Sequence, residues 1–361
     1  MTEKNYIYFY PSHQKVYFDA VTDMISQDDY HEELVTTNEF ILALAKRWLD
    51  GEEFFEFKTS GSTGHPKSII LYRKQIEASI RHTASVIKYI PNENCLLCLN
   101  PQHIGGAMVL LRAIELGLNV YVCPPQVDSI IQFFEKNQDI QHASFVPMQM
   151  QKLIDKNNPD SYRDQIENIK YILLGGATIS KKLEETLSTF SNCIYQTYGM
   201  TETSSNIALR KLSNGVTEEY YTIFDGIEIK IDDRNCLSIK GEITNHIWLQ
   251  TNDVVEFKDA KKIKIIGRAD FVINSGGIKI HPEILEQKLL PQMGDKIYLI
   301  SSKPDDTLGE RVVLIIESSE KMNLNFDELQ PYEKPKEVLY INGLPRTDSG
   351  KMDRMVLKKL L

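Results

Sequence analysis

The sequence lacks several features that would assign it to a broad class of protein. No apolar stretch approaches the roughly 20 residues that cross a bilayer. The first six residues, MTEKNY, lack the basic start and apolar run of a secretory signal. The formal net charge is −9, and no block of lysine and arginine suits a nucleic-acid backbone. We therefore expect a cytoplasmic protein that has no membrane span and does not bind nucleic acid.

Cysteine is scarce and odd in number. The five cysteines, at positions 95, 98, 123, 193 and 236, stand mostly in apolar, strand-like runs, which is typical of reduced thiols in a core. Cys95 and Cys98 have the spacing of half a zinc site. No second Cys-x-x-Cys or histidine pair accompanies them, so we expect a buried strand here.

Internal repeats and low-complexity tracts are also missing, and the composition is that of a globular protein. Hydrophobic residues make up 42% and charged residues 25% of the 361 positions. A single hydrophobic core usually stops growing at roughly 250–300 residues. The sequence therefore predicts two domains, which we place at residues 1–268 and 269–361.

Apolar periodicity predicts an α/β fold in the larger domain. Strands are expected at 54–57, 69–71, 95–99, 120–123, 143–146 and 171–174, and helices at 38–48, 75–89, 107–116, 130–136, 148–155 and 181–189. Their alternation is typical of a parallel sheet covered by helices. Short strands at 227–231, 237–240 and 247–249 predict a small antiparallel section. After a strand at 263–266, the last ninety or so residues read as a compact α+β domain.

A glycine- and hydroxyl-rich loop stands between the first two predicted strands. Its small residues leave many backbone N–H groups exposed, which suits a polyphosphate. These residues are Thr59, Ser60, Gly61, Ser62, Thr63, Gly64 and Lys67. Pro66, where a Walker A motif needs glycine, excludes that motif. A plain surface turn is the structural alternative.

Further stretches follow in a defined order. They are Gly175-Gly176-Ala177, Gln196-Thr197-Tyr198-Gly199-Met200-Thr201-Glu202-Thr203, Gln250-Thr251-Asn252-Asp253, Gly267-Arg268-Ala269-Asp270, the segment from Ser275 to Glu286, and Leu344-Pro345-Arg346-Thr347-Asp348-Ser349-Gly350-Lys351. Together with the phosphate loop, this set resembles the signatures of the adenylate-forming superfamily, which includes acyl-CoA synthetases, luciferases and peptide-synthetase adenylation domains. The resemblance covers the chain from about Thr59 to Lys351.

The resemblance implies ATP and Mg²⁺ as cofactors and coenzyme A as co-substrate. Within the second signature it assigns adenine stacking to Tyr198, an α-phosphate contact to Thr201 and the metal ion to Glu202. A hard cation prefers carboxylate oxygen, which agrees with the last assignment. The two glycines of the stretch at Gly175, Gly176 and Ala177 would let a flat ligand approach the backbone, although a tight turn is an equal alternative.

The remaining signatures imply ribose contacts and a mobile C-terminal domain. Asp253 and Arg268 would bind the ribose hydroxyls, and Asp270 would be the hinge. Asn252 replaces the glycine of the family pattern, and because asparagine tolerates a positive φ we expect a turn there. Gly276, Gly277 and Lys279 would line the pantetheine tunnel. Lys351 would stabilise the charge that develops during adenylation.

The implied reaction activates a small carboxylic acid as an acyl-adenylate, which coenzyme A then attacks. The chain reaches its phosphate loop early and so resembles a shortened member of the superfamily. The segment from Asn100 to Met108 looks like the His-x-x-Gly element of o-succinylbenzoate–CoA ligases of menaquinone synthesis. There His103 would line the acyl pocket, or else simply cap the next helix. Polar donors for a second carboxylate could come from Ser144, Gln149, Gln196 and residues 204–206.

Three alternatives stay open. The chain could be another short-chain or aromatic acyl-CoA synthetase, a stand-alone adenylation domain that loads a carrier protein, or a nucleotide-binding module without catalysis. The joint presence of Glu202, Asp253 and Lys351 argues against the last. Monomer and homodimer are equally compatible with the sequence.

Overall fold

The structure, a computed structural model, describes residues 4–24, 36–59, 67–136, 139–155, 162–294, 296–346 and 352–361. The chain divides into two units. The first contains Met1–Thr59, Ser68–Glu228 and Lys240–Ile247, and the second contains Ser60–Lys67, Ile229–Ile239 and Trp248–Leu361. The domain boundary after residue 268 therefore stays a prediction.

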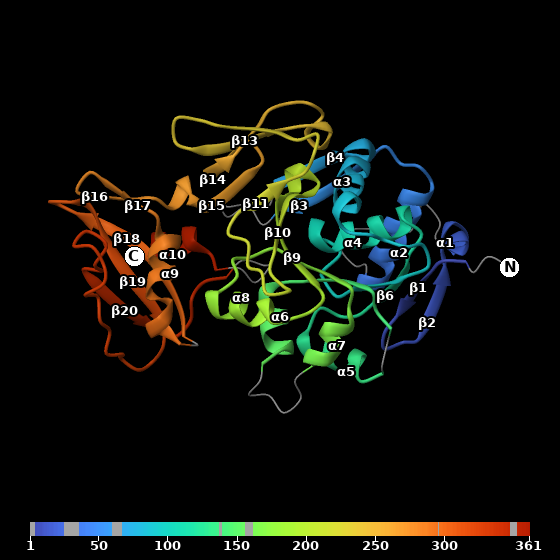
Figure 1. Ribbon diagram of the computed structural model, residues 1–361, viewed down its shortest axis with the longest axis horizontal. Helices are drawn as coiled ribbons and strands as arrows, with labels where there is room; N and C mark the ends of the chain where they lie inside the picture. Colours follow the sequence, from blue (N-terminus) through green and yellow to red (C-terminus); the bar gives the residue numbers. More distant parts are fainter. Residues whose placement is uncertain are drawn as a thin grey trace. The chain divides into compact units, whose positions relative to one another are not determined.

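A parallel sheet forms the centre of the first unit (Figure 1). Its strands, in spatial order, are β9 (Cys193–Met200), β8 (Tyr171–Leu174), β7 (His142–Phe145), β5 (Asn94–Leu97), β6 (Asn119–Val122) and β1 (Tyr6–Phe9). Every neighbouring pair in this series is parallel. Antiparallel strands extend both sides, namely β10 (Ser205–Lys211) and β11 (Tyr221–Ile223) beyond β9, and β2 (Gln14–Tyr17) beyond β1. The predicted α/β fold is confirmed.

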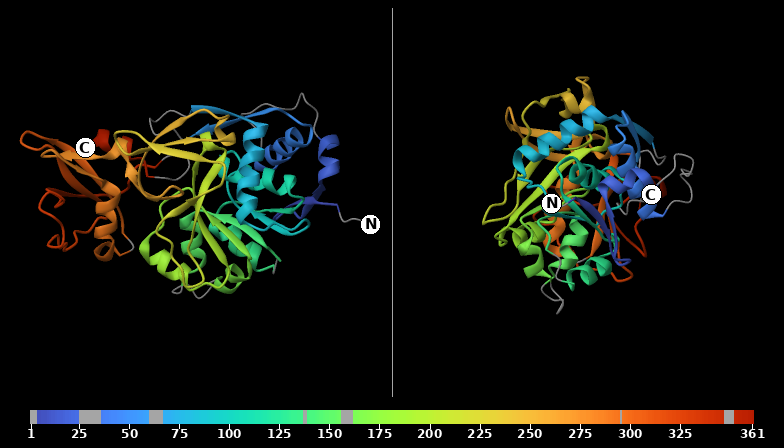
Figure 2. Two further views of the ribbon diagram at one scale, coloured as in Figure 1. Left: turned by 45° about the horizontal axis from the view of Figure 1, so that its top comes forward. Right: turned by 90° about the vertical axis from the view of Figure 1, so that its right-hand side faces the viewer.

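Helices cover both faces of this sheet (Figures 1 and 2). Successive side chains of a strand point to opposite faces, so Cys95 and Leu97 of β5 join one core cluster and Leu96 joins another. The first cluster includes side chains of α2 (Thr37–Leu49), α3 (Arg73–Val86) and α4 (Ile104–Glu115). The second includes side chains of α5 (Val127–Phe134), α6 (Pro147–Leu153), α7 (Arg163–Asn168) and α8 (Lys181–Ser188). Each face therefore has its own core.

Two smaller features complete the first unit. β3 (Phe54–Thr59) and β4 (Lys67–Tyr72) form a two-stranded ribbon, and the short helix α1 (Phe18–Met24) follows β2. Cys95 and Cys98 are both buried, as predicted for core thiols. Within the described ranges, no helix is both long enough and apolar enough to cross a membrane.

The second unit contains a four-stranded antiparallel series and a five-stranded sheet. One is the antiparallel series β12 (Glu228–Ile231), β13 (Cys236–Lys240), β14 (Leu249–Asp259) and β15 (Lys262–Arg268). The other comprises β17 (Ile278–Ile280), β16 (Ile273–Ser275), β19 (Gly309–Glu317), β18 (Ile297–Asp305) and β20 (Glu337–Ile341). Alternate residues of β19 pack on α9 (Pro282–Met293) and on α10 (Arg354–Leu360), one helix for each face. The predicted antiparallel section and α+β tail are confirmed.

Two local predictions in this region are wrong. The strand expected at 247–249 begins only at Leu249, because Asn245 and His246 have φ values of 50° and 57° and form a left-handed turn after the short helix η3 (Glu242–Thr244). The turn expected at Asn252 is also absent. Asn252 lies inside β14, where its backbone has no positive φ.

Candidate functional site

The carboxyl ends of the parallel strands bring several predicted residues to one edge of the first unit's sheet. Gly175 and the two residues after it follow β8, and Thr201 and Glu202 follow β9. Leu174 lies opposite Gln196 in neighbouring parallel strands, so both segments leave the sheet at the same edge. This edge is where open α/β sheets bind ligands.

Close packing explains the glycines after β8. A Cβ atom on Gly175 would lie 2.6 Å from Thr197 Oγ1, because β9 runs on past the end of β8. Gly176 has a φ of 84°, which favours glycine. Gly176 and Ala177 are exposed, and Ala177 O accepts a hydrogen bond from Gln196 Nε2 at 3.5 Å. The tight-turn alternative is therefore confirmed, and the approach of a ligand to this backbone stays a prediction.

The second signature forms a tight hairpin rather than a loop. Tyr198 and Gly199 lie on β9, and Thr201–Thr203 form the short helix η2 that leads into β10. A Cβ atom on Gly199 would lie 1.9 Å from Ser205 O on the neighbouring strand, so only glycine fits there. Ser204 and Ser205 have φ values of 53° and 105°. Backbone strain of this kind is concentrated at functional sites and needs support from its surroundings.

Buried hydrogen bonds provide that support. Ser79 Oγ on α3 donates to Ser204 O at 2.8 Å, and Asn206 Nδ2 donates to Thr83 Oγ1 at 3.2 Å. Thr203 Oγ1 lies 3.1 Å from Met200 N, which donates to it. These contacts fix the hairpin tip that presents Thr201 and Glu202.

Glu202 is the best candidate for a metal ligand at this tip. Its carboxylate is half-buried and has no hydrogen-bond or ion-pair partner in the part of the chain that the structure describes. A carboxylate left open in this way suits a hard cation that also keeps water and phosphate ligands. In the same described ranges, no group of three or more His, Cys, Asp and Glu side chains is arranged to hold a metal ion. The site therefore fits a magnesium ion that would be held by Glu202 together with phosphate and water oxygens.

Tyr198 and His103 lie near the same edge of the first unit's sheet. Tyr198 is half-buried, and its ring centroid lies 5.9 Å from that of Tyr221. His103 occupies the N-cap position of α4, which follows β5, but its side chain makes no capping hydrogen bond. The helix-capping alternative for His103 therefore lacks its expected contact.

Arg112, which the sequence analysis did not single out, is the most unusual polar residue of this unit. It lies in the last turn of α4, is 5% exposed, and its Nε has no hydrogen-bond partner. Among the described residues no carboxylate forms an ion pair with it, and Thr83 Oγ1 is 3.5 Å from its Nη2. A buried arginine normally has a partner, and it cannot lose its charge.

Arg112 borders a narrow cavity between α4 and the sheet, here called the Arg112 cavity. It has room for little more than a water molecule. Its walls are Ile87, Tyr89, Cys95, Val109, Arg112, Ala113, Leu118, His142, Ala143, Ser144, Tyr171 and Leu173. A single cation within the largely apolar stretch 107–116, in which Glu115 is the only other charged residue, was the signal in the sequence that could have revealed it.

Other polar residues proposed for the acyl pocket are already engaged. Gln149 Nε2 donates to Cys98 O at 3.0 Å and to Pro125 O at 2.8 Å. Gln196 Oε1 accepts from Arg210 Nε at 2.6 Å. Both amides therefore stabilise the fold, whereas Ser144 lines the Arg112 cavity.

The second unit pairs two of the predicted ribose ligands directly. Asp253 on β14 lies opposite Arg268 on β15, and their side chains approach to 3.4 Å between Oδ1 and Nη1. Arg268 Nη2 also lies 2.6 Å from Asp270 Oδ2. Asp253 is 9% exposed, so a hydroxyl that reached its carboxylate would be bound away from bulk water.

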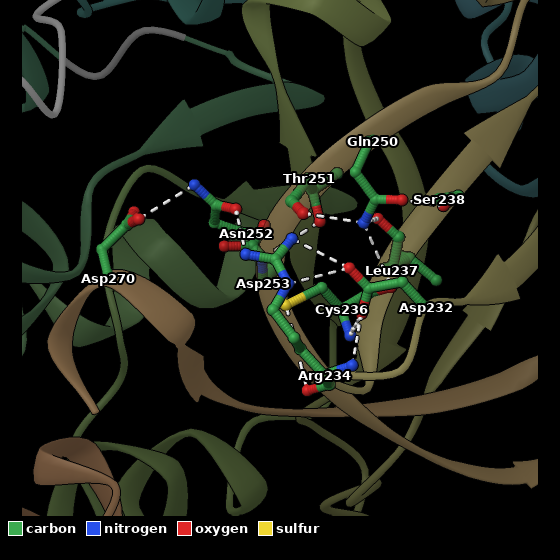
Figure 3. A network of polar contacts seen from close by, with 10 residues as sticks. All are labelled: Asp232, Arg234, Cys236, Leu237, Ser238, Gln250, Thr251, Asn252, Asp253 and Asp270. Atoms are coloured by element: carbon green, nitrogen blue, oxygen red, sulfur yellow. Dashed lines mark hydrogen bonds and ion pairs between the residues drawn. The ribbon is translucent and has the colours of Figure 1, made fainter. Parts of the chain in front are cut away.

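Asn252 ties this group to the neighbouring turn (Figure 3). Its Nδ2 donates to Asp270 Oδ1 at 2.9 Å, and its Oδ1 accepts from Arg234 Nη1 at 3.4 Å. Arg234 in turn lies 2.8 Å from Asp232 Oδ2. The departure from the family glycine thus provides a side chain that links the predicted hinge residue, Asp270, to the turn after β12.

The signature from Ser275 onward forms a two-residue hairpin. Ser275 lies opposite Ile278, and Gly276 and Gly277 have φ values of 59° and 81°, which this type of turn requires. Lys279 is exposed on β17. The hairpin geometry accounts for both glycines, and their proposed place in a pantetheine tunnel stays a prediction.

Part of the predicted site lies outside the described residues. Ser60, Gly61, Ser62, Thr63, Gly64 and Lys351 are in this group. Thr59 is the last residue of β3, and Lys67 is the first of β4 and is exposed. The phosphate loop is therefore flanked by the two strands of one ribbon, as predicted.

Comparison with known proteins gives one family. Residues 55–246 match the family of AMP-binding enzymes. A solved structure, an acyl-CoA synthetase (AMP-forming)/AMP-acid ligase II-like protein from Dyadobacter fermentans, is 32% identical, with a TM-score of 0.60. That match covers 92% of this chain and 97% of the other.

Curated relatives are similar over most of the chain. The 2-succinylbenzoate–CoA ligase of Listeria monocytogenes is 27% identical and covers 94% of this chain and 77% of its own length. The Staphylococcus epidermidis protein of the same name is 28% identical over 83% of this chain and 68% of its own. The o-succinylbenzoate coenzyme A synthetase of Bacillus subtilis, solved with ATP and magnesium, has a TM-score of 0.72. It is 22% identical over 83% of this chain and 68% of its own, and supports the fold.

Proposed function

Because the chain belongs to the AMP-binding enzyme family, we propose that it is an ATP-dependent acid–CoA ligase that works through an acyl-adenylate. Its acid is o-succinylbenzoate, and its products are o-succinylbenzoyl-CoA, AMP and pyrophosphate. The names of the similar curated proteins support this choice of acid. The site at the carboxyl edge of the sheet supports the chemistry.

In the first step a carboxylate oxygen attacks the α-phosphorus of ATP, and pyrophosphate leaves. The phosphate loop from Thr59 to Lys67 holds the departing phosphates, and Tyr198 stacks on adenine. The hydroxyl of Thr201 donates a hydrogen bond to the α-phosphate, and Lys351 stabilises the charge that develops there. In the second unit, Asp253 accepts hydrogen bonds from the ribose hydroxyls beside Arg268.

Magnesium, when bound, neutralises the phosphate oxygens and favours departure of pyrophosphate. Glu202 would hold it, which agrees with the half-buried carboxylate that has no partner among the described residues. In the second step the thiol of coenzyme A attacks the acyl carbonyl, and AMP leaves. Gly276, Gly277 and Lys279 are proposed to contact the pantetheine arm during this step.

The single observation that carries the choice of acid is the buried guanidinium of Arg112. o-Succinylbenzoate has two carboxylates, so a negative charge remains after one of them has been activated. Leaving an arginine without a counter-charge in an apolar core is costly, and a carboxylate is its best partner. An acid with a second carboxylate would supply the charge that the Arg112 cavity lacks among the described residues.

Helix geometry places Arg112 within reach of such an acid. Arg112 follows His103 by nine positions, which is about 13 Å along an α-helix. A long side chain on a helix leans toward the N-terminus, so the guanidinium lies closer to His103 than this rise suggests. The cavity also borders His142 and Tyr171, the first residues of β7 and β8, so an acid activated at the His103 end would extend along the strands to place its second carboxylate near Arg112.

Thioester formation with a panel of acids tests the proposal. The panel contains o-succinylbenzoate, its analogue without the ring carboxylate, benzoate and medium-chain fatty acids. We expect o-succinylbenzoate to give the highest kcat/KM. A preference for fatty acids would overturn the choice of acid, and transfer to a carrier protein but not to coenzyme A would favour an adenylation domain. Failure of every acid to release pyrophosphate would favour a binding module without catalysis.

We also place the reaction in the cytoplasm. All five cysteines are free thiols, which is typical of a reducing compartment. Separation of membrane, periplasmic and cytoplasmic fractions would test this placement.

A further inference from the structure

A histidine shares the Arg112 cavity and is as buried as the arginine. His142, the first residue of β7, is 3% exposed, and its Nδ1 has no hydrogen-bond partner. Its ring lies between two tyrosines, with centroids 4.5 Å from Tyr89 and 5.7 Å from Tyr171. The cavity is therefore bordered by two unpartnered nitrogen atoms, Nδ1 of His142 and Nε of Arg112.

Glu93 fixes the orientation and the tautomer of this histidine. His142 Nε2 lies 2.7 Å from Glu93 Oε2, and Lys170 binds the other carboxylate oxygen. An ionised carboxylate only accepts hydrogen bonds, so the proton of a neutral His142 is on Nε2 and its Nδ1 carries a lone pair. Burial acts to raise the pKa of Glu93, but hydrogen bonds from Lys170 and His142 hold it below its usual value.

Burial also keeps His142 neutral in the free protein. It lowers the pKa of His142 below 6.5, although Glu93 acts in the opposite direction. The charged groups that face the ring are Glu93, Lys170 and Arg112. The partly buried Tyr89 and the buried Cys95 nearby stay neutral, since burial raises the pKa of each to about 12.

We propose that His142 is a second anchor for the distal carboxylate of the acid and takes up one proton from solvent when that acid binds. This inference rests on the proposed function. The cavity has room for little more than a water molecule, so it would widen to admit the carboxylate, to which Arg112 Nε–H and the newly protonated His142 Nδ1–H would each donate. The two donors are charged, so each bond is shorter and stronger than a neutral one. Without the proton, the lone pair of Nδ1 would face the carboxylate and repel it.

The proposal links substrate specificity to pH in a defined direction. Above the pKa of His142 in the free protein, which lies below 6.5, binding of the diacid requires proton uptake. The KM for the diacid therefore rises with pH, by up to roughly tenfold per unit. An analogue without the distal carboxylate needs no such proton and should show a flat KM over the same range.

Calorimetric titration of the diacid provides the test, with a non-hydrolysable ATP analogue present and with two buffers of different ionisation enthalpy. The wild type should take up close to one proton at pH 7.5, and His142→Phe, which keeps a ring between the tyrosines, should take up none. His82→Phe is the matched control, since His82 is also a partly buried histidine with an unpartnered Nδ1 but does not line the cavity. It should behave as the wild type.

Glu93→Gln is a second variant in case His142→Phe does not fold. It keeps an acceptor for Nε2 but removes the charge, so the rise of KM with pH should begin at lower pH. Equal proton uptake by His142→Phe and wild type, or one pH profile for diacid and analogue, would overturn the inference. If the wild type forms no thioester from the diacid, the proposed function itself fails.

Discussion

At the scale of single residues, Arg112 combines a structural cost with a proposed functional gain. The guanidinium is 5% exposed and has no ion-pair partner in the described ranges, so it should destabilise the protein without substrate. We expect Arg112→Met to unfold at equal or higher denaturant concentration than the wild type. The same variant should lose at least tenfold in kcat/KM for o-succinylbenzoate, about 1.4 kcal/mol of transition-state stabilisation.

Chemical denaturation and steady-state kinetics check this prediction together. The analogue without the ring carboxylate is the internal control, and its kcat/KM should change little. A variant that was less stable and lost activity equally with both acids would show that Arg112 serves the fold alone.

Sequence patterns identified some of these residues and missed others for a physical reason. Tyr198, Thr201 and Glu202 occur in one contiguous signature, so their types and spacing are visible in the chain. Arg112 and His142 are 30 positions apart and meet only because α4 packs on the sheet beside β7. Such a cluster depends on tertiary packing, which no local pattern encodes.

At the scale of secondary-structure elements, the hairpin of β9 and β10 depends on one close approach. A Cβ atom on Gly199 would lie 1.9 Å from Ser205 O, which belongs to backbone and cannot rotate away. We therefore expect Gly199→Ala to destabilise the protein by about 1–3 kcal/mol, as overpacking does. It should also displace Glu202, so that half-maximal activity requires a higher magnesium concentration.

Thermal or chemical unfolding of Gly199→Ala and Gly343→Ala forms a matched comparison. A Cβ on Gly343 has no heavy atom within 4 Å, and its φ is not positive, so that variant should match the wild type. Equal stability of the two variants would show that the approach of β10 to β9 is looser than described.

A half-buried ion pair joins α9 to α10 in the second unit. Glu286 Oε2 lies 2.5 Å from Arg354 Nη2, and Glu286 Oε1 accepts from Ile300 N at 2.7 Å. Burial raises the pKa of Glu286, and Arg354 acts in the opposite direction. In Arg354→Met that opposing charge is gone, so the pKa of Glu286 should rise further.

The pH dependence of this variant has a definite sign. A carboxyl whose pKa is raised by folding costs stability as pH rises through that pKa, because the charged form is favoured in the unfolded chain. Arg354→Met should therefore resemble the wild type near pH 4 and become less stable by about 2–3 kcal/mol toward pH 7. Denaturant unfolding across that range is the measurement, and a loss that did not vary with pH would contradict the assignment.

Predictions from the sequence succeeded for elements with strong apolar periodicity. The strands that became β5 to β8 and the helices between them were found because their buried residues repeat in a regular pattern. The strand β9 was not predicted, because Gln196, Thr197 and Tyr198 do not form an apolar run. The turn predicted at Asn252 failed because pairing of β14 with β15 outweighs the local preference of asparagine.

At the scale of the whole molecule, an acidic chain is proposed to bind several anions. The net charge is −9, while ATP, coenzyme A and the diacid are all negatively charged. Local cations are proposed for two of them, Lys67 and Lys351 for the phosphates of ATP and Arg112 for the diacid.

The fate of the carboxylate oxygen tests the central claim most directly. o-Succinylbenzoate labelled with ¹⁸O in its carboxylates is converted with ATP, magnesium and coenzyme A, and the products are analysed by mass spectrometry. In an acyl-adenylate mechanism one labelled oxygen forms the bond to the α-phosphorus and stays there when the thiol displaces AMP. The account predicts one ¹⁸O in each AMP and none in pyrophosphate. ADP with ¹⁸O in inorganic phosphate, or AMP without label, would contradict it.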